Sequence, residues 1–357
     1  MKRRQFIKRT AQAAAVSLGG ICSAPSLFAA DVPARARQLG IGMHSYGFAW
    51  KAARDGQPGA KFAGALSFLE YAHHIGAAGV QVAIRPDERD DAPRIRARAE
   101  ALGVFFEGQL SVPKDDADLA RFETEVKTIR AAGSTVARTA MLGTRRYESL
   151  KSAAEFRDFK ERAARSLALA EPVLKKHGVR LAIENHKDYL APELVQVLRK
   201  VSSEWVGACV DTGNSLALLE DPYAVVEALA PFAVTTHIKD MAVQEYADGF
   251  LLSEVPAGDG FLDLPRMIAT LRKANPRIAL NIEMITRDPL QIPCLTPAYW
   301  ATFGEMKAAQ LAAALARVKQ NTSPKPLPRT TGLSPAQQVE LEDQNVRQYL
   351  AWAQQKL

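Results

Sequence analysis

The stretch "RLAIENHKDY" (residues 180–189) begins as an apolar β-strand and ends in a dense group of polar and charged side chains. Residues two apart on a strand point to the same side. Glu184 and His186 therefore share one face, while Ile183 belongs to the other, apolar face. A strand that is apolar along its length and polar where it ends is typical of a parallel sheet that is covered on both sides.

Seven further strand-like runs alternate with helical segments along the chain. The eight expected strands are 39–46, 79–84, 103–110, 134–142, 178–185, 206–213, 233–240 and 278–285. The expected helices between them include 62–77, 93–102, 116–132, 150–177, 191–202, 222–230 and 263–274. Eight strand–helix units without a break in composition predict an α/β fold, a single (β/α)8 TIM barrel over residues 37–295. The main alternative, a doubly wound open sheet, would need a glycine-rich phosphate-binding loop after an early strand, and the sequence has none there.

The first thirty residues indicate an export signal rather than a part of the fold. The twin arginine of "KRRQFIK" (2–8) precedes a short alanine-rich stretch that makes a poor membrane span. Residues 1–30 carry five Lys and Arg side chains and no acid, so their removal lowers the formal charge from +7 to +2 (7 − 5 = 2). We therefore expect a periplasmic or exported protein with no stable membrane anchor after maturation and no nucleic-acid partner.

The chain continues beyond the barrel as a helical extension, residues 296–357. Residues 297–320 have a helical pattern, 321–335 form a proline-rich connector, and 336–357 form a final amphipathic helix. The extension carries no chemical motif of its own. We expect it to wrap around the barrel or to contact a partner subunit in a homo-oligomer.

Four consecutive strands each place an acid or a histidine at one mouth of the predicted barrel, where such folds hold their functional groups. In "ACVDTGN" and "LNIEMI" the inward acids are Asp211 and Glu283, and in "THIKD" the inward residues are His237 and Lys239. With Glu184, three carboxylates would share one cavity, where they would repel each other and lose hydration. A divalent cation removes that cost. The largely oxygen donor set favours Mn²⁺ or Mg²⁺, with Co²⁺, Fe²⁺ and Zn²⁺ also compatible.

The motifs "IENH", "VDTGN", "HIKD" and "NIEM", together with "PAGDGFLD" (256–263), resemble the strand ends of the xylose isomerase-like TIM barrels, the sugar (phosphate) isomerase/epimerase superfamily. The similarity extends over roughly residues 37–290. It implies that the metal ligands are Glu184, Asp211, His237 and Glu283. In ketose epimerases of this family the two glutamates also move protons on opposite faces of the sugar, which implies a catalytic role for Glu184 and Glu283.

Other polar residues at the strand ends are assigned to the surroundings of this metal. We expect His186 and Lys239 to polarise or protonate substrate oxygens, and Asn214 and Asp240 to orient the ligands. The upstream strand ends supply the expected pocket walls, which are His44, Glu107, Gln109 and Arg138.

These features predict an isomerase or epimerase that removes and returns a proton next to the carbonyl of a small carbohydrate. An exported enzyme meets few phosphorylated metabolites, so we expect a non-phosphorylated sugar or sugar derivative. The same first step followed by loss of a β-substituent would give a lyase or dehydratase, for example on a 3-keto-glycoside or a keto-inositol. A non-catalytic sugar-binding protein is a further alternative. Metal-dependent phosphodiester cleavage on a related barrel is disfavoured, because its sites use many histidines and this chain has six.

Overall fold

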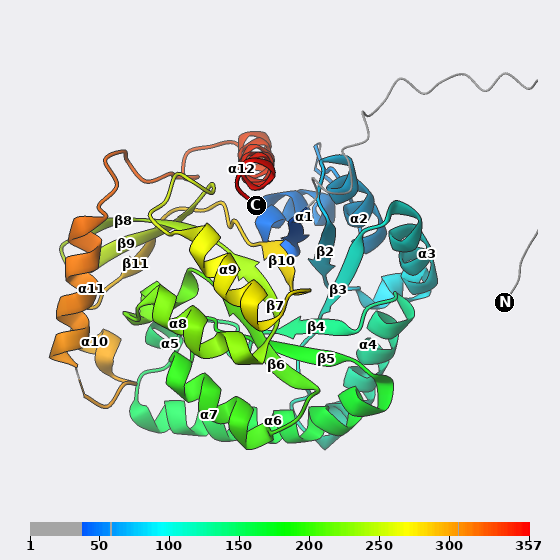
Figure 1. Cartoon of the computed structure of the whole chain (residues 1–357), viewed down its shortest axis with the longest axis horizontal. Helices are drawn as coiled ribbons and strands as arrows, with labels where there is room; N and C mark the ends of the chain where they lie inside the picture. The colour runs from blue at the N-terminus through cyan, green and yellow to red at the C-terminus, as the bar shows by residue number, and fades with distance from the viewer. Residues whose placement is uncertain (1–37, 58, 306) are drawn as a thin grey trace, which may run out of the picture. The chain divides into compact units, whose positions relative to one another are not determined.

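The computed structural model describes residues 38–357 except 58 and 306, so the expected export signal lies outside the described residues (Figure 1). Eight parallel strands close into a barrel. They are β1 (Gly40–Gly42), β2 (Gly79–Val82), β3 (Phe105–Gln109), β4 (Val136–Thr139), β5 (Arg180–Glu184), β6 (Val206–Asp211), β7 (Ala233–Ile238) and β10 (Ala279–Ile282). Each pairs with its neighbours in this order, and β10 pairs with β1 to close the barrel. The predicted (β/α)8 barrel is confirmed, and each of the eight barrel strands lies within its expected range.

Helices follow the strands and cover the outside of the barrel (Figure 1). They are α2 (Ala65–His74), α3 (Ala92–Leu102), α4 (Leu119–Ala131), α6 (Ala153–His177), α7 (Ala191–Val201), α8 (Pro222–Leu229) and α9 (Leu264–Ala274). The longest of these, α6, begins where the Ser152 side chain accepts the Glu155 N–H, and it ends at Gly178, whose φ of 64° suits glycine. Two short helices, α1 (Gly47–Arg54) and α5 (Arg146–Ser149), were not predicted.

Short 3₁₀ segments shape the loops at the carboxyl ends of several strands. They include η2 (Met43–Tyr46) directly after β1, η3 (Pro86–Asp91) after β2, η4 (Asp116–Asp118) before α4 and η5 (Asn214–Leu218) after β6. A further one, η6 (Ala230–Phe232), leads into β7. The η2 segment explains why β1 is shorter than expected, because the chain turns into a helix at Met43.

Alternation along the strands separates two groups of apolar side chains. The outward residues Ile183, Val210 and Ile238 belong to the large core between the barrel and its helices. A small separate cluster fills part of the barrel interior and consists of Val136, Ala182, Cys209 and Val234. Ala182 and Ile183 thus fall on the two faces that the sequence pattern assigned to them.

An antiparallel sheet of β8 (Asp240–Tyr246), β9 (Gly249–Val255) and β11 (Leu290–Ile292) projects from the barrel after β7. This sheet was not predicted, although residues 240–255 include β-branched and aromatic side chains and an Asp-Gly pair marks the turn. Gly249 has a φ of 150°, and a Cβ there would lie 2.2 Å from the carbonyl oxygen of Ile292. Only glycine therefore fits this turn without displacing the neighbouring strand.

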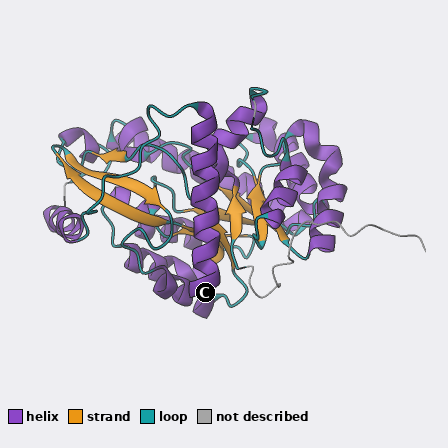
Figure 2. Ribbon diagram, turned by 90° about the horizontal axis from the view of Figure 1, so that it is seen from above, coloured by secondary structure: helices purple, strands orange, loops and turns teal. Residues whose placement is uncertain are grey.

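The extension folds as α10 (Pro297–Trp300), α11 (Ala308–Gln320) and α12 (Pro335–Lys356), so the single helix expected over 297–320 is divided. Figure 2 shows α12, which leads to the C-terminus, as a long helix lying across the other elements. Glu342 of α12 accepts the backbone N–H groups of Phe48 and Ala49 at 2.7 and 2.9 Å, at the start of α1. The extension therefore packs on the loop that follows β1. No helix within residues 38–357 combines the length and the apolar character needed to cross a membrane.

Candidate metal and substrate site

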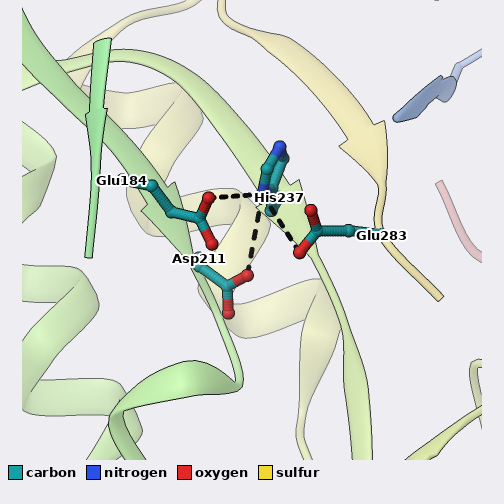
Figure 3. A group of neighbouring side chains, drawn as sticks. All are labelled: Glu184, Asp211, His237 and Glu283. Carbon is teal, nitrogen blue, oxygen red and sulfur yellow. Dashed lines mark ion pairs between the residues drawn. The ribbon is translucent and has the colours of Figure 1, made fainter. Parts of the chain in front are cut away.

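Four side chains at the carboxyl ends of consecutive strands meet in one buried cluster. Glu184 and Asp211 are the last residues of β5 and β6, His237 lies one residue before the end of β7, and Glu283 follows β10. The Nδ1 atom of His237 lies 3.5 Å from Glu184, 3.8 Å from Asp211 and 3.3 Å from Glu283 (Figure 3). One donor atom from each residue lies within 4.8 Å of all the others. The structure thus brings together the four residues expected to be ligands.

The donor atoms of this cluster suit a divalent cation. Nδ1 of His237 and Oδ2 of Asp211 are buried without a hydrogen bond among the described residues. The other ring nitrogen, Nε2 of His237, lies 2.7 Å from the acceptor Oε1 of Gln81, so Nε2 carries a proton, and Nδ1 is the ring atom that can give its lone pair to a metal once it is deprotonated. The 4.8 Å spread is close to the roughly 4.2 Å between opposite ligands of an ion bound at about 2.1 Å. The cluster therefore fits a metal ion of the size of Mg²⁺ or Mn²⁺.

Two cations modify the charge balance that the sequence suggested. Arg138 donates to Oε2 of Glu184, and Nζ of Lys239 lies 3.0 Å from Asp211 and 2.5 Å from Glu283. The expectation of uncompensated carboxylates was wrong, because two cations face three acids and leave one net negative charge (2 − 3 = −1). The fit to a metal therefore rests on the convergence of the four donor atoms, and on Nδ1 of His237, which has no hydrogen bond among the described residues, rather than on carboxylate repulsion.

These cations also control the protonation of the two glutamates. Burial alone would raise the pKa of Glu184, but Arg138 and His237 together outweigh burial and hold the pKa well below its ordinary value. Burial would likewise raise the pKa of Glu283, and His237 and Lys239 lower it well below the ordinary value. Both glutamates are therefore carboxylates at neutral pH and can accept protons.

Asn214 connects the ligands to the lysines behind them. Its Nδ2 donates to Glu184 at 2.7 Å, and its Oδ1 accepts from Lys239 at 3.2 Å and also from Lys187. Its backbone N–H donates to Asp211 at 2.8 Å. Asn214 thus contacts two of the candidate ligands, as expected of a residue that orients them. Lys187 was not predicted, because its position within a run of charged residues does not reveal that it turns inward.

Asp240 lies elsewhere than predicted. Its carboxylate accepts the backbone N–H groups of Gly258 at 2.8 Å, Gly260 at 3.1 Å and Leu262 at 3.2 Å. A Cβ at Gly260 would lie 2.0 Å from Oδ1 of Asp240, so only glycine allows this approach. Asp240 therefore fixes the loop 256–263 and does not orient a metal ligand.

Glu107 also differs from its expected place as a pocket wall. It is buried inside the barrel, where Oε2 accepts from Gln81, Thr235 and Asn281 at 3.0, 2.7 and 3.0 Å. Gln81 joins this group to His237 and was missed by the sequence analysis. A signal for Gln81 existed, since it is the one polar residue in the apolar run "GVQVAI" and alternates with the outward-facing valines.

A cavity of about 590 Å³ opens beside the cluster. Its lining includes Glu283 and four residues predicted for the pocket or for catalysis, which are His44, Gln109, Arg138 and His186. Burial lowers the pKa of His44, and it lowers the pKa of His186 to about 3, so both imidazoles are neutral at pH 7. His186 keeps a buried Nδ1 without a hydrogen bond within the described part of the chain. It can therefore exchange a hydrogen bond with a substrate hydroxyl, as a neutral group rather than as a cation.

We expect His237→Ala to weaken Mn²⁺ binding by at least about tenfold, because it removes the imidazole donor of the cluster. Although burial opposes its charged form, His237 has a pKa well above the ordinary value when no metal is bound, and Glu283 and Glu184 contribute to this increase. A proton and a metal would then compete for Nδ1, so wild-type affinity should rise with pH. Titration calorimetry of chelator-treated protein measures both effects. His177→Ala, which alters a histidine paired with Glu123 on the outside of the barrel, is the control, and equal affinity of the two variants would contradict the site.

Comparisons with known proteins agree with this geometry. A model of the family described as "xylose isomerase-like TIM barrel" matches residues 69–316. The chain is 28% identical over 256 residues to 3-oxo-isoapionate decarboxylase from Pectobacterium atrosepticum, which covers 69% of this chain and 85% of that protein.

Two solved structures show the same fold at low sequence identity. The 3-keto-D-glucoside 4-epimerase from E. coli has a TM-score of 0.53 at 13% identity, covering 80% of this chain and 99% of that chain. A xylose isomerase-like TIM barrel protein from Mycobacterium smegmatis in complex with magnesium has a TM-score of 0.51 at 16% identity, with the same coverage.

Proposed function

Because the chain belongs to the xylose isomerase-like TIM barrel family, we propose that it is a divalent-metal-dependent enzyme acting on a non-phosphorylated sugar or sugar derivative. The proposed reaction moves a proton next to a carbonyl and gives isomerisation or epimerisation. One observation carries the proposal. Glu184 and Glu283, both carboxylates at neutral pH, enter the cluster from opposite sides of His237 (Figure 3).

The residues of the cluster would have separate roles in metal binding and proton transfer. A divalent ion held by Glu184, Asp211, His237 and Glu283 would polarise the substrate carbonyl and make the neighbouring C–H more acidic. One glutamate accepts that proton, and the other glutamate, itself a carboxylate in the free protein, takes up a proton from solvent and delivers it to the opposite face of the same carbon. Lys239 remains charged, since Asp211 and Glu283 raise its pKa against the effect of burial.

A second candidate is loss of a carboxyl group from a 3-oxo sugar acid. The similarity to 3-oxo-isoapionate decarboxylase over 85% of that protein favours it. Breaking the bond to the carboxylate releases CO₂ and leaves an enolate of the same kind as proton removal does. The glutamates would then only donate a proton to that carbon. Expulsion of a β-substituent, as in a lyase or dehydratase, starts from the same enolate.

Incubation of the Mn²⁺-loaded protein with free ketoses, 3-keto-glycosides and 3-oxo sugar acids in D₂O tests these proposals. We expect NMR to show deuterium entering beside the carbonyl of at least one panel member. An inverted centre or a moved carbonyl then identifies an epimerase or isomerase, release of CO₂ a decarboxylase, and release of an aglycone a lyase. Tight binding of a panel member without exchange or turnover would instead support a sugar-binding protein.

A further inference from the structure

The lining of the cavity beside the cluster contains more cationic than anionic side chains. Besides the two neutral imidazoles, its charged lining consists of four arginines and two glutamates, which are Arg85, Arg89, Arg121, Arg138, Glu125 and Glu283. Arg85 and Arg89 follow β2, Arg121 lies in α4, and Arg138 lies in β4. A neutral sugar does not require this excess of positive charge. How much of this positive charge is left for a ligand depends on the partner of each arginine.

Three of the four guanidinium groups already have carboxylate partners. Arg138 pairs with Glu184, Arg85 lies 3.3 Å from both Asp87 and Glu88, and Arg121 lies 2.6 and 2.7 Å from Asp118 and Glu125. Arg89 differs, because its guanidinium group makes no hydrogen bond or ion pair with the residues that the structure describes. It is thus the arginine of this lining whose charge is left for a ligand.

The backbone that carries Arg89 is held in place. Arg89 lies in η3, next to the buried Glu88, whose carboxylate accepts the N–H groups of Arg85 and Ala65, both at 3.0 Å. These two bonds attach η3 to the start of α2 and set the position from which Arg89 reaches the cavity. Because the backbone at Arg89 is already fixed, less conformational entropy is lost when the Arg89 side chain binds a ligand.

We infer that the substrate of the proposed reaction is a sugar acid, and that Arg89 binds its carboxylate while its carbonyl lies at the metal cluster. The planar guanidinium group matches the two oxygens of a carboxylate. A phosphate carries more charge and is commonly held by several donors, including backbone N–H groups, whereas one unpaired arginine faces this cavity. Arg89 and Glu283 line the same cavity, whose volume of about 590 Å³ leaves room for a sugar acid.

Calorimetry on the Mn²⁺-loaded protein at low salt tests this inference, which rests on the proposed function. The probes are matched pairs, D-glucuronate with D-glucose and 2-keto-D-gluconate with D-fructose. We expect the acid of at least one pair to bind about tenfold more tightly than its neutral partner, and Arg89→Gln to remove this difference without weakening the neutral partner. Arg98→Gln is the control, because Arg98 lies on the outside of α3, paired with Glu70.

Several outcomes would overturn the inference. Equal affinity within both pairs, no binding of any acid, or an equal effect of Arg89→Gln on acid and neutral sugar would each do so. Tighter binding of D-glucose 6-phosphate than of D-glucuronate would show that the site takes a phosphate instead.

The same probes separate this inference from the proposed function. Deuterium exchange on a neutral ketose, together with no preference for acids, would leave the function standing and refute the role of Arg89. Binding of acids that depends on Arg89, with no exchange or turnover of any probe, would support the role of Arg89 and refute the proposed function.

Discussion

Glu283→Gln is expected to lower deuterium exchange beside the substrate carbonyl by at least about 1,000-fold, and Glu184→Gln should have a similar effect. Each substitution removes a carboxylate that accepts or donates the transferred proton, a step to which general acid–base catalysis contributes about 10²–10⁴-fold. Because the two glutamates lie on opposite sides of the cluster (Figure 3), each variant should lose exchange with one of two epimeric substrates. Exchange followed by NMR, starting from each epimer separately, measures this directly.

Two controls are needed for these variants: one for loss of bound Mn²⁺ and one for disturbance of the polar group inside the barrel. Mn²⁺ content, measured on the same samples, separates loss of a proton-transferring group from loss of a ligand. Glu107→Gln is the matched variant, since Glu107 is another inward carboxylate that accepts hydrogen bonds one layer below the cluster. It should retain exchange within a few-fold. A loss as large as that of Glu283→Gln would show that the chemistry depends on the inner polar group instead.

The barrel and the four-residue cluster could be predicted because both follow from local alternation. In a β-strand, successive side chains point to opposite faces, so the position of a residue along the strand decides whether its side chain points into the barrel. Asp211 and His237 illustrate this, since they pair in register on neighbouring strands. Once the strands close into a barrel, inward residues at their carboxyl ends must meet.

Partners of these side chains could not be predicted in the same way. The alternation of side chains places both Glu107 and Glu283 inside the barrel. It does not reveal that Glu107 lies below the cluster whereas Glu283 is part of it. The ion pair between Arg138 and Glu184 joins the adjacent strands β4 and β5, where Arg138 is in register with Ala182, so it depends on the reach of the arginine side chain along the strand, which the pattern does not contain. The same holds for Asp240, whose short side chain is taken up by the loop at Gly258 and Gly260.

For the C-terminal helix, too, the sequence pattern predicted the element but not the contacts of its side chains. Its amphipathic pattern predicted a helix over 336–357, and α12 covers nearly the same residues. The pattern did not show that Asp343 would be a buried anion. Its side chain is only 5% exposed, and it accepts from Tyr46 at 2.9 Å, from Lys61 and Arg347 at 2.8 Å each, and from Tyr71. Tyr46 ends η2, which carries His44 at the cavity, so α12 helps to place a wall of the site.

Asp343→Ala is expected to lower the free energy of unfolding by about 2–4 kcal/mol, because it leaves the buried Tyr46 hydroxyl without its acceptor and two cations without their partner. Chemical denaturation measures the loss. Glu340→Ala is the control on the same helix. Glu340 is 59% exposed and lies 3.8 Å from Lys61, so its loss should change stability by less than about 0.5 kcal/mol. Similar values for the two variants would show that α12 does not depend on Asp343.

Asp343→Asn isolates the charge, and its effect should depend on pH. Burial alone would raise the pKa of Asp343, but hydrogen bonds from Arg347, Lys61 and Tyr71 outweigh burial and lower the pKa to about 2. A carboxyl whose pKa falls on folding stabilises the protein above its unfolded pKa of about 3.9 and loses that effect as the pH approaches the folded value. The wild type should therefore exceed Asp343→Asn by about 1–2 kcal/mol at pH 7, after allowance for solvent screening. This difference should begin to shrink below about pH 4, and a difference that grew on acidification would show that Asp343 is not bound as an anion.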